Sequence, residues 1–473
     1  MNTSKCLLDS IIPRPCMITP EDSQLLLTSL TAICCEKTLQ KIGQSLSERL
    51  AQYGLNLPCT HQSAGCTIRL QIDQTQPEET WRMKVNASGI LLTGGDAAGI
   101  FYGTEALTQI LCVCSCNGWD NDAIPYGEIE DYPRYRWRGF MLDSARHFQP
   151  VEQIVHLLKI FGKHRINVFH WHLIDHQGFR TPSKIAPALN SIRRISPGHY
   201  SEEDIAAVRQ AAAENFITIV PEIEMPGHCG GLLDLFPQYA CTPTGASAAE
   251  VCIGKPEARQ FFKALITEFA ALFPDSPIIH LGGDEASTLR WQNCPDCQKA
   301  MQKKNFTDLR QLEADFMTEM ASHVISLGRR PMTWFTEQPL PDEVITQCWS
   351  TDESVGAMVN CGGEYVYSLS KHCYFDYPAT AAEPLFEWTA SLPELAVYDA
   401  HPCIAWKAAL ANRLLGIEAC MWTEAIPPWR TFSKIVPRLQ AWAENAWSQA
   451  KQKEFHDFSR RKELLTACGY NFG

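Results

Sequence analysis

The sequence is poor in positive charge. Its 473 residues carry 41 Lys and Arg against 53 Asp and Glu, which gives a formal net charge of −12. Proteins that bind a nucleic-acid backbone present a basic face, so this balance argues against a nucleic-acid partner. Neither a Gly-x-Gly-x-x-Gly after an early strand nor a Gly-x-x-x-x-Gly-Lys-Ser/Thr occurs, which disfavours a dinucleotide or phosphate site.

Long apolar stretches are also missing. No segment approaches the length that a membrane span needs, so we expect no membrane partner. The first residues, Met1 to Cys16, lack the continuous apolar core behind a basic region that defines a secretion signal. The expected location is therefore cytoplasmic, unless a leader has been removed. The sequence does not indicate an oligomeric state.

Cysteine, in contrast, is abundant, with 20 in the chain. Many stand in apolar runs, as Cys348, Cys373 and Cys420 do, where a free thiol behaves as a small hydrophobic side chain. We therefore expect reduced core cysteines and no disulfide framework. The exception is Cys294-Pro-Asp-Cys297, where a structural metal, a local disulfide and two free thiols all remain open. Zinc would need a second pair or added histidines. We expect no cofactor and no catalytic metal.

The composition is that of a globular protein, 45% hydrophobic and 20% charged, and the length allows two cores. Residues 1–132 predict a small α+β domain and residues 133–473 a second domain. The polar, proline-containing stretch Asp120–Arg136 resembles a linker between them. The elements expected in the first domain are strands at Cys66–Asp73, Trp81–Asn86 and Ile90–Thr93 and helices at Glu36–Tyr53 and Ala97–Leu111.

From residue 138 onward, short apolar runs alternate with amphipathic helices. This alternation implies a parallel sheet, and eight repeats fit a closed (β/α)8 TIM barrel. A doubly wound open sheet is the alternative, because helices between the sixth and eighth runs are weakly marked. The eight runs are Arg138–Asp143, Asn167–Asp175, Phe216–Glu224, Ile278–Glu285, Pro331–Phe335, Val344–Trp349, His372–Asp376 and Gly416–Glu424. The clearest helices are Val151–His164, Glu202–Asn215, Glu257–Phe273, Leu309–Leu327 and Ser433–Ala446.

Nearly every run ends in polar or aromatic residues that a strand core does not need. Gly282 and Gly283 let the backbone pass close to whatever Asp284 and Glu285 serve. Alone, such a carboxylate pair is more often part of a solvated loop or a helix N-terminus. Its recurrence with other polar strand ends indicates a site, because the carboxyl ends of parallel strands meet at one face. The collected residues are Arg146, Asp175, Glu224, His228, Asp284, Glu285, Trp334, Trp349, Tyr374, Asp376, Trp422 and Glu424.

Carboxylates with tryptophans suit a neutral, hydroxyl-rich ligand, since carboxylates accept hydroxyl hydrogen bonds and indoles cover the apolar faces of a sugar. Four ordered segments resemble the β-N-acetylhexosaminidases of glycoside hydrolase family 20. They are Arg138–Phe148, Asn167–Asp175, Pro221–His228 and His280–Glu285. That family also carries a small α+β domain before its barrel, so the resemblance covers the whole chain.

The resemblance implies an exo-acting β-N-acetylhexosaminidase that uses the substrate acetamide as nucleophile. Glu285 would be the general acid, with a pKa raised by burial and by Asp284, and Asp284 would bind the acetamide N–H. Tyr374 would donate to the acetamide oxygen. The remaining roles would fall to three groups: Trp334, Trp349 and Trp422 around the acetyl group; Arg146, Asp376 and Glu424 on ring hydroxyls; and Asp175, His228, Glu224 and His172 around the catalytic pair.

Two other readings stay open: a carbohydrate-binding relative without turnover, and an enzyme that releases a disaccharide or a sulfated sugar. The expected partner in each case is a glycan, here one with a terminal N-acetylhexosamine. The chain departs from the family pattern at His176 and Phe179, in Asp175-His-Gln-Gly-Phe-Arg180. This departure concerns the loop that carries Asp175.

Overall fold

The computed structural model describes residues 8–62, 65–116, 123–192, 195–241, 249–336, 338–351, 357, 362–383, 389–400 and 408–472. Its contacts divide the chain into two compact units. The first comprises Met1–Arg136, Ile160–Arg165 and Val436–Gly473, and the second comprises Trp137–Lys159 and Ile166–Ile435. The grouping of Val436–Gly473 with the first unit differs from the expected single boundary at residue 132.

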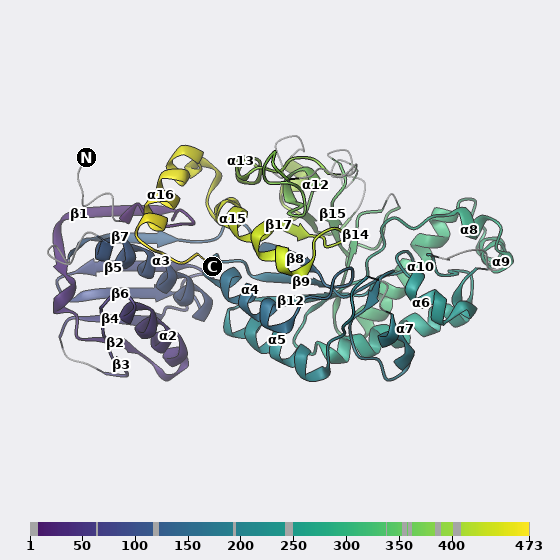
Figure 1. Cartoon of the computed structure of the whole chain (residues 1–473), viewed down its shortest axis with the longest axis horizontal. Helices are drawn as coiled ribbons and strands as arrows, with labels where there is room; N and C mark the ends of the chain where they lie inside the picture. Colours follow the sequence, from purple (N-terminus) through teal and green to yellow (C-terminus); the bar gives the residue numbers. More distant parts are fainter. Residues whose placement is uncertain are drawn as a thin grey trace. The chain divides into compact units, whose positions relative to one another are not determined.

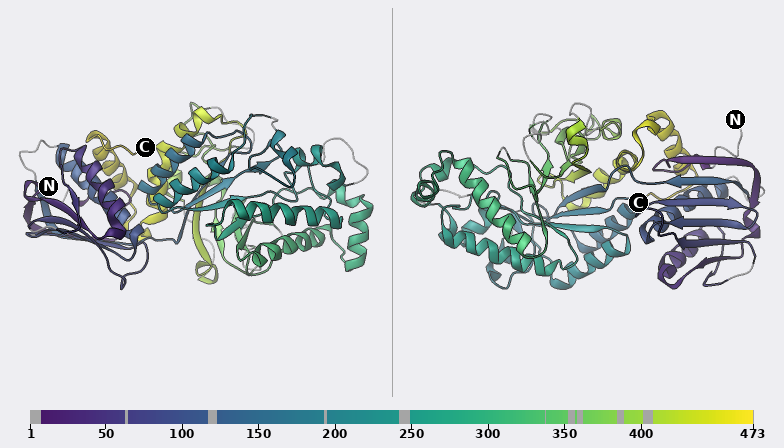
Figure 2. Two further views of the ribbon diagram at one scale, coloured as in Figure 1. Left: turned by 90° about the horizontal axis from the view of Figure 1, so that it is seen from below. Right: turned by 180° about the vertical axis from the view of Figure 1, so that it is seen from behind.

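The first unit contains a seven-stranded sheet, and α2 (Gln40–Ala51) and α3 (Ala97–Cys116) lie on one face of it (Figures 1 and 2). Strand β5 shows why: Trp81, Met83 and Val85 are buried while the residues between them face outward. The strand order is β1-β7-β5-β6-β4-β2-β3. The strands are β1 Met17–Leu26, β2 Ala32–Cys35, β3 Cys59–Thr60, β4 Thr67–Ile72, β5 Trp81–Asn86, β6 Gly89–Gly94 and β7 Ala123–Asp131.

The predicted linker Asp120–Arg136 is wrong over most of its described length. Residues 120–122 lie outside the described residues, but Ala123–Asp131 forms β7, which pairs with both β1 and β5. Gly127, Ile129 and Asp131 are buried, whereas Glu128 and Glu130 point away from the core. The outward charges and Pro125 made a half-buried strand look like a polar connection.

Helix α3 differs from the expectation that no segment approaches the length of a membrane span. By length and composition it could cross a membrane. However, 94% of its most apolar stretch is buried within the protein, which is the usual situation of a core helix. It is the one such helix among the described residues.

The second unit is built on a closed barrel of eight parallel strands, so the predicted fold class is confirmed. Each strand contributes one apolar side chain to a common cluster: Trp137, Val168, Val220, Ile278, Met332, Ile345, Val366 and Leu415. Most of these residues stand in the first half of their strands, so this cluster leaves the carboxyl ends free for polar groups. The strands are β8 Trp137–Asp143, β9 Val168–His172, β12 Thr218–Glu222, β13 Ile278–His280, β14 Arg330–Trp334, β15 Ile345–Cys348, β16 Tyr365–Tyr367 and β17 Leu414–Met421.

The seventh barrel strand was predicted in the wrong place. It is Tyr365–Tyr367, which pairs with β15 and β17, and not His372–Asp376. The latter segment contains the end of α12 (Ser370–Cys373) and then Tyr374, which forms an isolated bridge with Cys420. Three residues are too short a run for a periodic pattern, while the longer apolar run near Tyr374 imitates a strand.

The long helices agree with the predictions to within a few residues, apart from an earlier start of α15 and a later end of α3. Two begin with a capping box, from Ser201 and Asp204 in α5 and from Asp308 and Gln311 in α10. Between β15 and β17 the described helices are short. The helices of the barrel region are α4 Val151–Lys163, α5 Glu202–Glu214, α6 Gly230–Leu235, α7 Pro256–Leu272, α8 Leu289–Gln292, α9 Pro295–Lys304, α10 Leu309–Ser326, α12, α13 Glu394–Tyr398, α14 Ala408–Ala411 and α15 Pro428–Trp447, and α16 Phe455–Ala467 follows.

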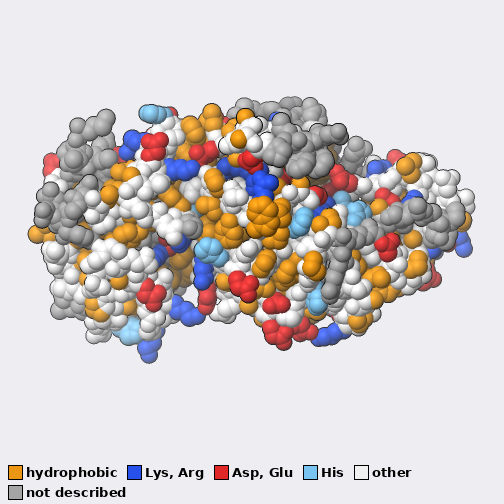
Figure 3. Space-filling model, viewed as in Figure 1, with side chains coloured by type: hydrophobic (Ala, Val, Ile, Leu, Met, Phe, Trp, Pro, Cys, Tyr) orange, Lys and Arg blue, Asp and Glu red, His pale blue; other side chains and the backbone are white. Residues whose placement is uncertain are grey.

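Charged side chains are interspersed on the face drawn in Figure 3. Among the described residues on that face, Lys and Arg alternate with Asp and Glu and form no continuous basic surface.

Candidate active site

A cavity of about 340 Å³ lies where the barrel strands end. Its lining residues stand at the end of β8, β9, β12, β13, β15, β16 and β17 or follow these strands in the chain, so they gather at the carboxyl ends of the strands, as expected. Of the predicted site residues, Trp334 alone is not in the lining. Ser370 and Tyr377 belong to the lining and were not predicted. The lining consists of Arg146, His172, Asp175, Glu224, His228, Asp284, Glu285, Trp349, Ser370, Tyr374, Asp376, Tyr377, Trp422 and Glu424.

A chain of charged contacts runs through the cavity wall to Glu285. Arg146 Nη2 lies 2.7 Å from Asp175 Oδ2, and the same oxygen lies 3.3 Å from His228 Nδ1. The other ring nitrogen of His228, Nε2, is 3.5 Å from Glu285 Oε2. Burial opposes the charge on His228, but Asp175 and Glu285 outweigh this effect and raise its pKa well above the ordinary value. The imidazole is therefore cationic at neutral pH.

The state of Glu285 contradicts its expected burial and raised pKa. Its side chain is 59% exposed, and the hydrogen bond from His228 lowers its pKa. Adjacent position in the sequence does not bring Glu285 into the same environment as Asp284, because the backbone turns between them. Glu285 is therefore ionised, and His228 holds the proton.

Asp284 shows the opposite behaviour. Burial raises its pKa to about 6, with additional contributions from Glu222 and Glu285. Its Oδ1 is buried and has no hydrogen-bond partner among the described residues. Burial and the negative charges of Asp284 and Glu222 likewise raise the pKa of Glu224 well above normal, so Glu224 is neutral. A buried acceptor without a donor is costly unless a ligand supplies one.

Sequence reasoning missed the buried carboxylate Glu222. His172 Nδ1 forms a hydrogen bond with Glu222 Oε2, and ring nitrogens of His170 and His280 lie 3.1 and 2.9 Å from the Glu222 carboxylate oxygens. These imidazoles offset the effect of burial and lower the pKa of Glu222 well below normal, while the pKa of His170 rises to about 9. The signal was present, because Glu222 and Glu224 are two residues apart in the predicted run Phe216–Glu224, and alternate residues of a strand share one face.

The aromatic wall is arranged differently from the prediction. Trp422 lines the cavity, with its ring 6.0 Å from Tyr374 and 5.0 Å from the Arg146 guanidinium carbon. Trp334 is 1% exposed and packs against Trp422 at 5.7 Å. Its Nε1 donates to Glu222 Oε1 over 2.7 Å. Trp334 therefore supports the wall from the barrel interior and does not form it.

The departures at His176 and Phe179 leave the loop in place. Ile174–Asp175 (β10) pairs with Gly178–Phe179 (β11), and Phe179 is buried. His176 Nδ1 accepts a hydrogen bond from the Gly230 N–H over 2.9 Å, which ties the hairpin to the start of α6. Arg180 donates to the Ser144 and Ala145 carbonyls. The hairpin thereby still holds Asp175 in the cavity.

Several His and carboxylate groups in and below the cavity are close enough to share a metal ion, for example His170, Glu222 and His280. Their side chains already pair with one another, as the contacts of Glu222 and Asp175 show. They form a network of mutual ion pairs, and the chemistry described below does not call on a metal.

Two non-glycine residues of the site have left-handed backbone conformations, His228 with φ 51° and Glu285 with φ 52°. Such conformations cost about 1–3 kcal/mol and persist when the surroundings enforce them. Gly282, with φ 66°, contributes to that enforcement. A Cβ there would lie 2.0 Å from Glu224 Oε2, so only glycine lets the strand end close on this carboxyl group.

Gly282→Ala should therefore destabilise the protein more than the backbone alone requires. Gly328→Ala is the matched control, since Gly328 has φ 72° and no atom within 4 Å of its added Cβ. We expect about 1 kcal/mol from Gly328→Ala and about 1–3 kcal/mol more from Gly282→Ala, because of the clash. Urea denaturation of both variants measures this, and equal losses would show that Glu224 moves aside without cost.

Comparison with known proteins assigns the family. The profile of Glycosyl hydrolase family 20, catalytic domain, matches residues 135–450, and that of Glycosyl hydrolase family 20, domain 2, matches residues 9–132. A β-hexosaminidase of Porphyromonas gingivalis is 31% identical over 492 residues, which covers 97% of this chain and 63% of that protein. A β-hexosaminidase of Akkermansia muciniphila is 29% identical, with 85% and 86% covered.

A solved structure supports the same assignment. The family 20 exo-β-N-acetylglucosaminidase from Vibrio harveyi, in complex with N-acetylglucosamine, has a TM-score of 0.85 at 25% identity. The match covers 98% of this chain and 78% of that one. The two family matches follow each other along nearly the whole chain, and the protein therefore belongs to glycosyl hydrolase family 20 and is a glycoside hydrolase.

Proposed function

We propose that this protein is an exo-acting β-N-acetylhexosaminidase, which removes terminal GlcNAc or GalNAc with retention through attack by the substrate's own acetamide. The observation that carries this proposal is the unpartnered, buried Oδ1 of Asp284 beside the exposed Glu285. An N-acetyl group supplies the missing N–H donor. The β-hexosaminidase names of the similar proteins and the N-acetylglucosamine bound in the Vibrio harveyi structure support the same sugar.

Glu285 is the general acid in this scheme. In the free protein the proton resides on His228, 3.5 Å away. A bound sugar displaces water from Glu285, which makes its ionised form less stable and raises its pKa, so that the proton can pass to it. Glu285 then protonates the glycosidic oxygen as the bond to the anomeric carbon breaks. As a carboxylate, it later takes a proton from the water that attacks the same carbon.

Asp284 and Tyr374 hold the nucleophile. Asp284 Oδ1 accepts the acetamide N–H, and burial raises the pKa of Tyr374, so its phenol keeps the proton that it donates to the acetamide oxygen. The oxygen bonds to the anomeric carbon and forms an oxazolinium ring, whose positive charge lies next to Asp284. An oriented internal nucleophile gains a large effective molarity, so no attacking side chain is required.

The non-reducing end of the sugar has a charged recess. Arg146, Asp376 and Glu424 line the cavity and offer a cationic donor and acceptor oxygens for ring hydroxyls. Arg146 is fixed by Asp175, while Glu424 is 42% exposed and 3.5 Å from the guanidinium. These contacts to hydroxyls of the terminal ring favour an exo-acting enzyme.

A second cavity, next to the first, can hold the leaving group. A neighbouring cavity of about 530 Å³ shares Asp284, Glu285 and Trp349 with the first and extends past Arg310 and Glu313. Glu285 therefore stands between two cavities, which is the place of a group that protonates the oxygen between two sugars. We assign the first cavity to the terminal sugar and the second to the aglycone.

Glu285→Gln should reduce turnover of alkyl glycosides and chitobiose by about 10²–10⁴-fold, because these leaving groups need a proton. Activated aryl N-acetylglucosaminides should lose much less. Steady-state kinetics across a series of leaving-group pKa values measures the difference. Glu313→Gln, in the aglycone cavity, is the control and should show no such dependence. Equal losses on all substrates of the Glu285→Gln variant would contradict the assignment.

His228→Asn should move the alkaline limb of kcat/KM to lower pH. The raised pKa of His228 means that the shared proton stays in the site below that pKa and is lost as the pH rises through it. Without the imidazole, Glu285 alone must hold the proton, so the limb should shift by more than about one unit. His156→Asn, at an exposed position of α4, is the control. An unchanged limb in His228→Asn would refute the proton-holding role.

Asp284→Asn should lower kcat sharply, by about 10²-fold or more, because the cyclised intermediate loses its counter-charge. A thiazoline analogue of that intermediate should inhibit the wild-type protein strongly and the variant weakly. Glucosides that lack the acetamide should be hydrolysed negligibly. Comparable rates on plain glucosides, or a trapped glycosyl ester on any carboxylate, would exclude the acetamide as nucleophile.

A further inference from the structure

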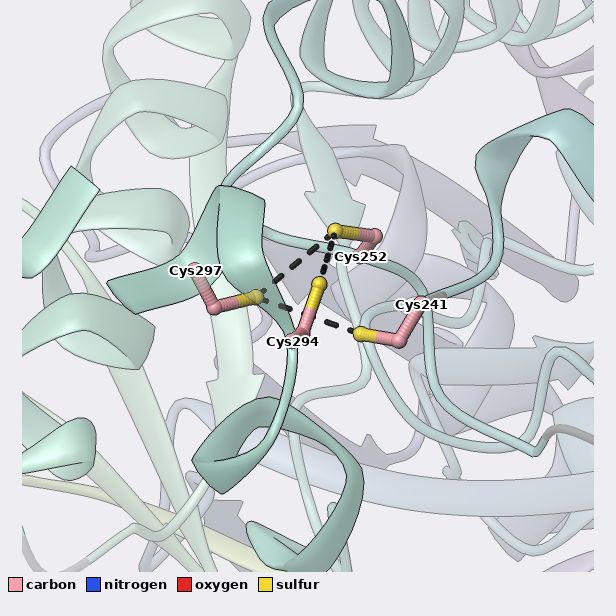
Figure 4. Close-up of side chains that lie close together, drawn as sticks. All are labelled: Cys241, Cys252, Cys294 and Cys297. Atoms are coloured by element: carbon pink, nitrogen blue, oxygen red, sulfur yellow. Dashed lines mark hydrogen bonds between the residues drawn. The ribbon is translucent and has the colours of Figure 1, made fainter. Parts of the chain in front are cut away.

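Four cysteines from two separate loops meet outside the active site. Cys241 and Cys252 lie between β12 and α7, and Cys294 and Cys297 lie at the start of α9. All four are buried, with at most 2% exposure, and Figure 4 shows their sulfur atoms directed toward a common centre. They are free thiols, and none of them lines the catalytic cavity.

The distances between the sulfur atoms fit a metal site and not a disulfide. Cys252 Sγ lies 3.5 Å from Cys294 Sγ and 3.6 Å from Cys297 Sγ, and Cys241 Sγ lies 3.9 Å from Cys297 Sγ. A disulfide requires about 2.0 Å. Four sulfurs at about 2.3 Å from a tetrahedral zinc ion stand about 3.8 Å from one another. All four sulfurs lie within 4.8 Å of each other, as one shared ion needs.

The backbone around these cysteines is shaped for close approach. A Cβ on Gly254 would lie 2.4 Å from the Cys297 nitrogen, so glycine allows the turn after Cys252 to pack against the Cys294–Cys297 turn. The Gly254 N–H also donates to Cys252 Sγ. Backbone donors to a sulfur stabilise the thiolate that binds a metal, as groups outside the ligand shell commonly do.

A second pair of close thiols, in the first unit, differs from the four-cysteine cluster in the number of sulfur atoms. Cys35 and Cys59 in the first unit have sulfurs 3.7 Å apart, but no third cysteine of the described residues forms a group with them. Among the described residues, the four-cysteine cluster is the one all-sulfur group that could hold an ion. Two buried thiols in contact are ordinary packing, whereas four from two loops form a complete ligand set.

We propose that Cys241, Cys252, Cys294 and Cys297 bind one zinc ion as a tetrahedral tetrathiolate site. Binding replaces four S–H bonds with four zinc–sulfur bonds and releases up to four protons, with no change in oxidation state. The donor set is closed, because four protein ligands leave no open position for substrate or water. The ion is therefore structural, and this inference does not depend on the proposed glycosidase activity.

The proposed zinc site links two loops that carry active-site residues. It joins the loop after β12, which carries His228, to the loop after β13, which carries Glu285. On one side the Val251 N–H donates to the Pro226 carbonyl, and the Cys229 N–H donates to the Ala249 carbonyl, both over 2.9 Å. These hydrogen bonds connect the cysteine loop to both ends of the segment around His228.

On the other side, Trp291 Nε1 donates to the Val251 carbonyl over 2.9 Å, and the Ser287 N–H donates to Glu250 over 3.3 Å. Cys294 follows Glu285 by one short helix, α8. A cross-link between the loops thus supports the segments that set the distance between His228 and Glu285, without touching the sugar.

The direct test is elemental analysis of the full-length wild-type protein, produced with added zinc chloride and purified without chelators. We expect about one zinc ion per chain. X-ray absorption at the zinc edge should give four sulfur neighbours at about 2.3 Å. Titration with a mercurial should release the zinc as four thiols react. These measurements need no variant, so they stand even if a variant fails to fold.

A matched pair of variants locates the ion. Cys294→Ser with Cys297→Ser should lower the zinc content at least tenfold and reduce the thermal midpoint by about 5 °C or more. Cys35→Ser with Cys59→Ser removes an equally close thiol pair and should leave about one zinc ion per chain.

Three outcomes would overturn the proposal. The first is a wild-type protein with less than about 0.1 zinc per chain, whose four thiols are alkylated freely or are found as disulfides by mass spectrometry. The second is zinc that remains in the Cys294→Ser, Cys297→Ser variant. The third is iron at full occupancy, recognised by its visible absorption, which would refute zinc as the ion.

Discussion

The site depends on the interactions of one buried carboxylate, Asp175. Its Oδ2 lies 2.7 Å from Arg146 Nη2, 3.2 Å from His172 Nε2 and 3.3 Å from His228 Nδ1. A negative charge at this depth is tolerated because three cationic side chains surround it, and the pKa of Asp175 is accordingly well below normal despite burial. The carboxylate in turn keeps His228 cationic, and His228 keeps Glu285 ionised. Removal of Asp175 would therefore affect residues that it does not touch.

The carboxyl groups of Asp284 and Glu285 have different environments although the two residues are adjacent in the sequence. Asp284 is turned into the protein, where burial raises its pKa, whereas Glu285 faces the cavity and receives a hydrogen bond from a cation. Groups with pKa values pushed apart can hold different roles in one reaction. The left-handed conformation of Glu285 separates the two side chains, and Gly282 and Gly283 before them provide the turn.

Much of this arrangement could be predicted from the sequence, because local patterns carried it. The eightfold alternation, the polar strand ends and the pair Asp284-Glu285 are all visible within short segments. The predictions that were wrong concern tertiary packing. The burial of Trp334 and the exposure of Glu285 follow from how strands and loops pack, and the neighbouring residues in the sequence do not determine this packing. Strand β16 was missed because Tyr365–Tyr367 is too short to show a period.

The four-cysteine cluster marks the same limit. Cys294 and Cys297 form a recognisable pair, but Cys241 and Cys252 are eleven positions apart from one another in sequence and more than forty positions from that pair. Only the pairing of two barrel loops makes them neighbours. Glu222 is an intermediate case, since its spacing from Glu224 indicates a shared face but not the three imidazoles that meet it.

The order of strands in the first unit has a consequence for synthesis on the ribosome. Strand β1 pairs only with β7, so the first strand of the sheet cannot join until the last one has emerged. Contacts between such distant segments are slow to form, because a long loop must close first. Meanwhile the apolar helix α3 has already been made and lacks part of the sheet that covers it, which exposes it to aggregation. The interval is short, since α3 ends at Cys116 and β7 begins at Ala123.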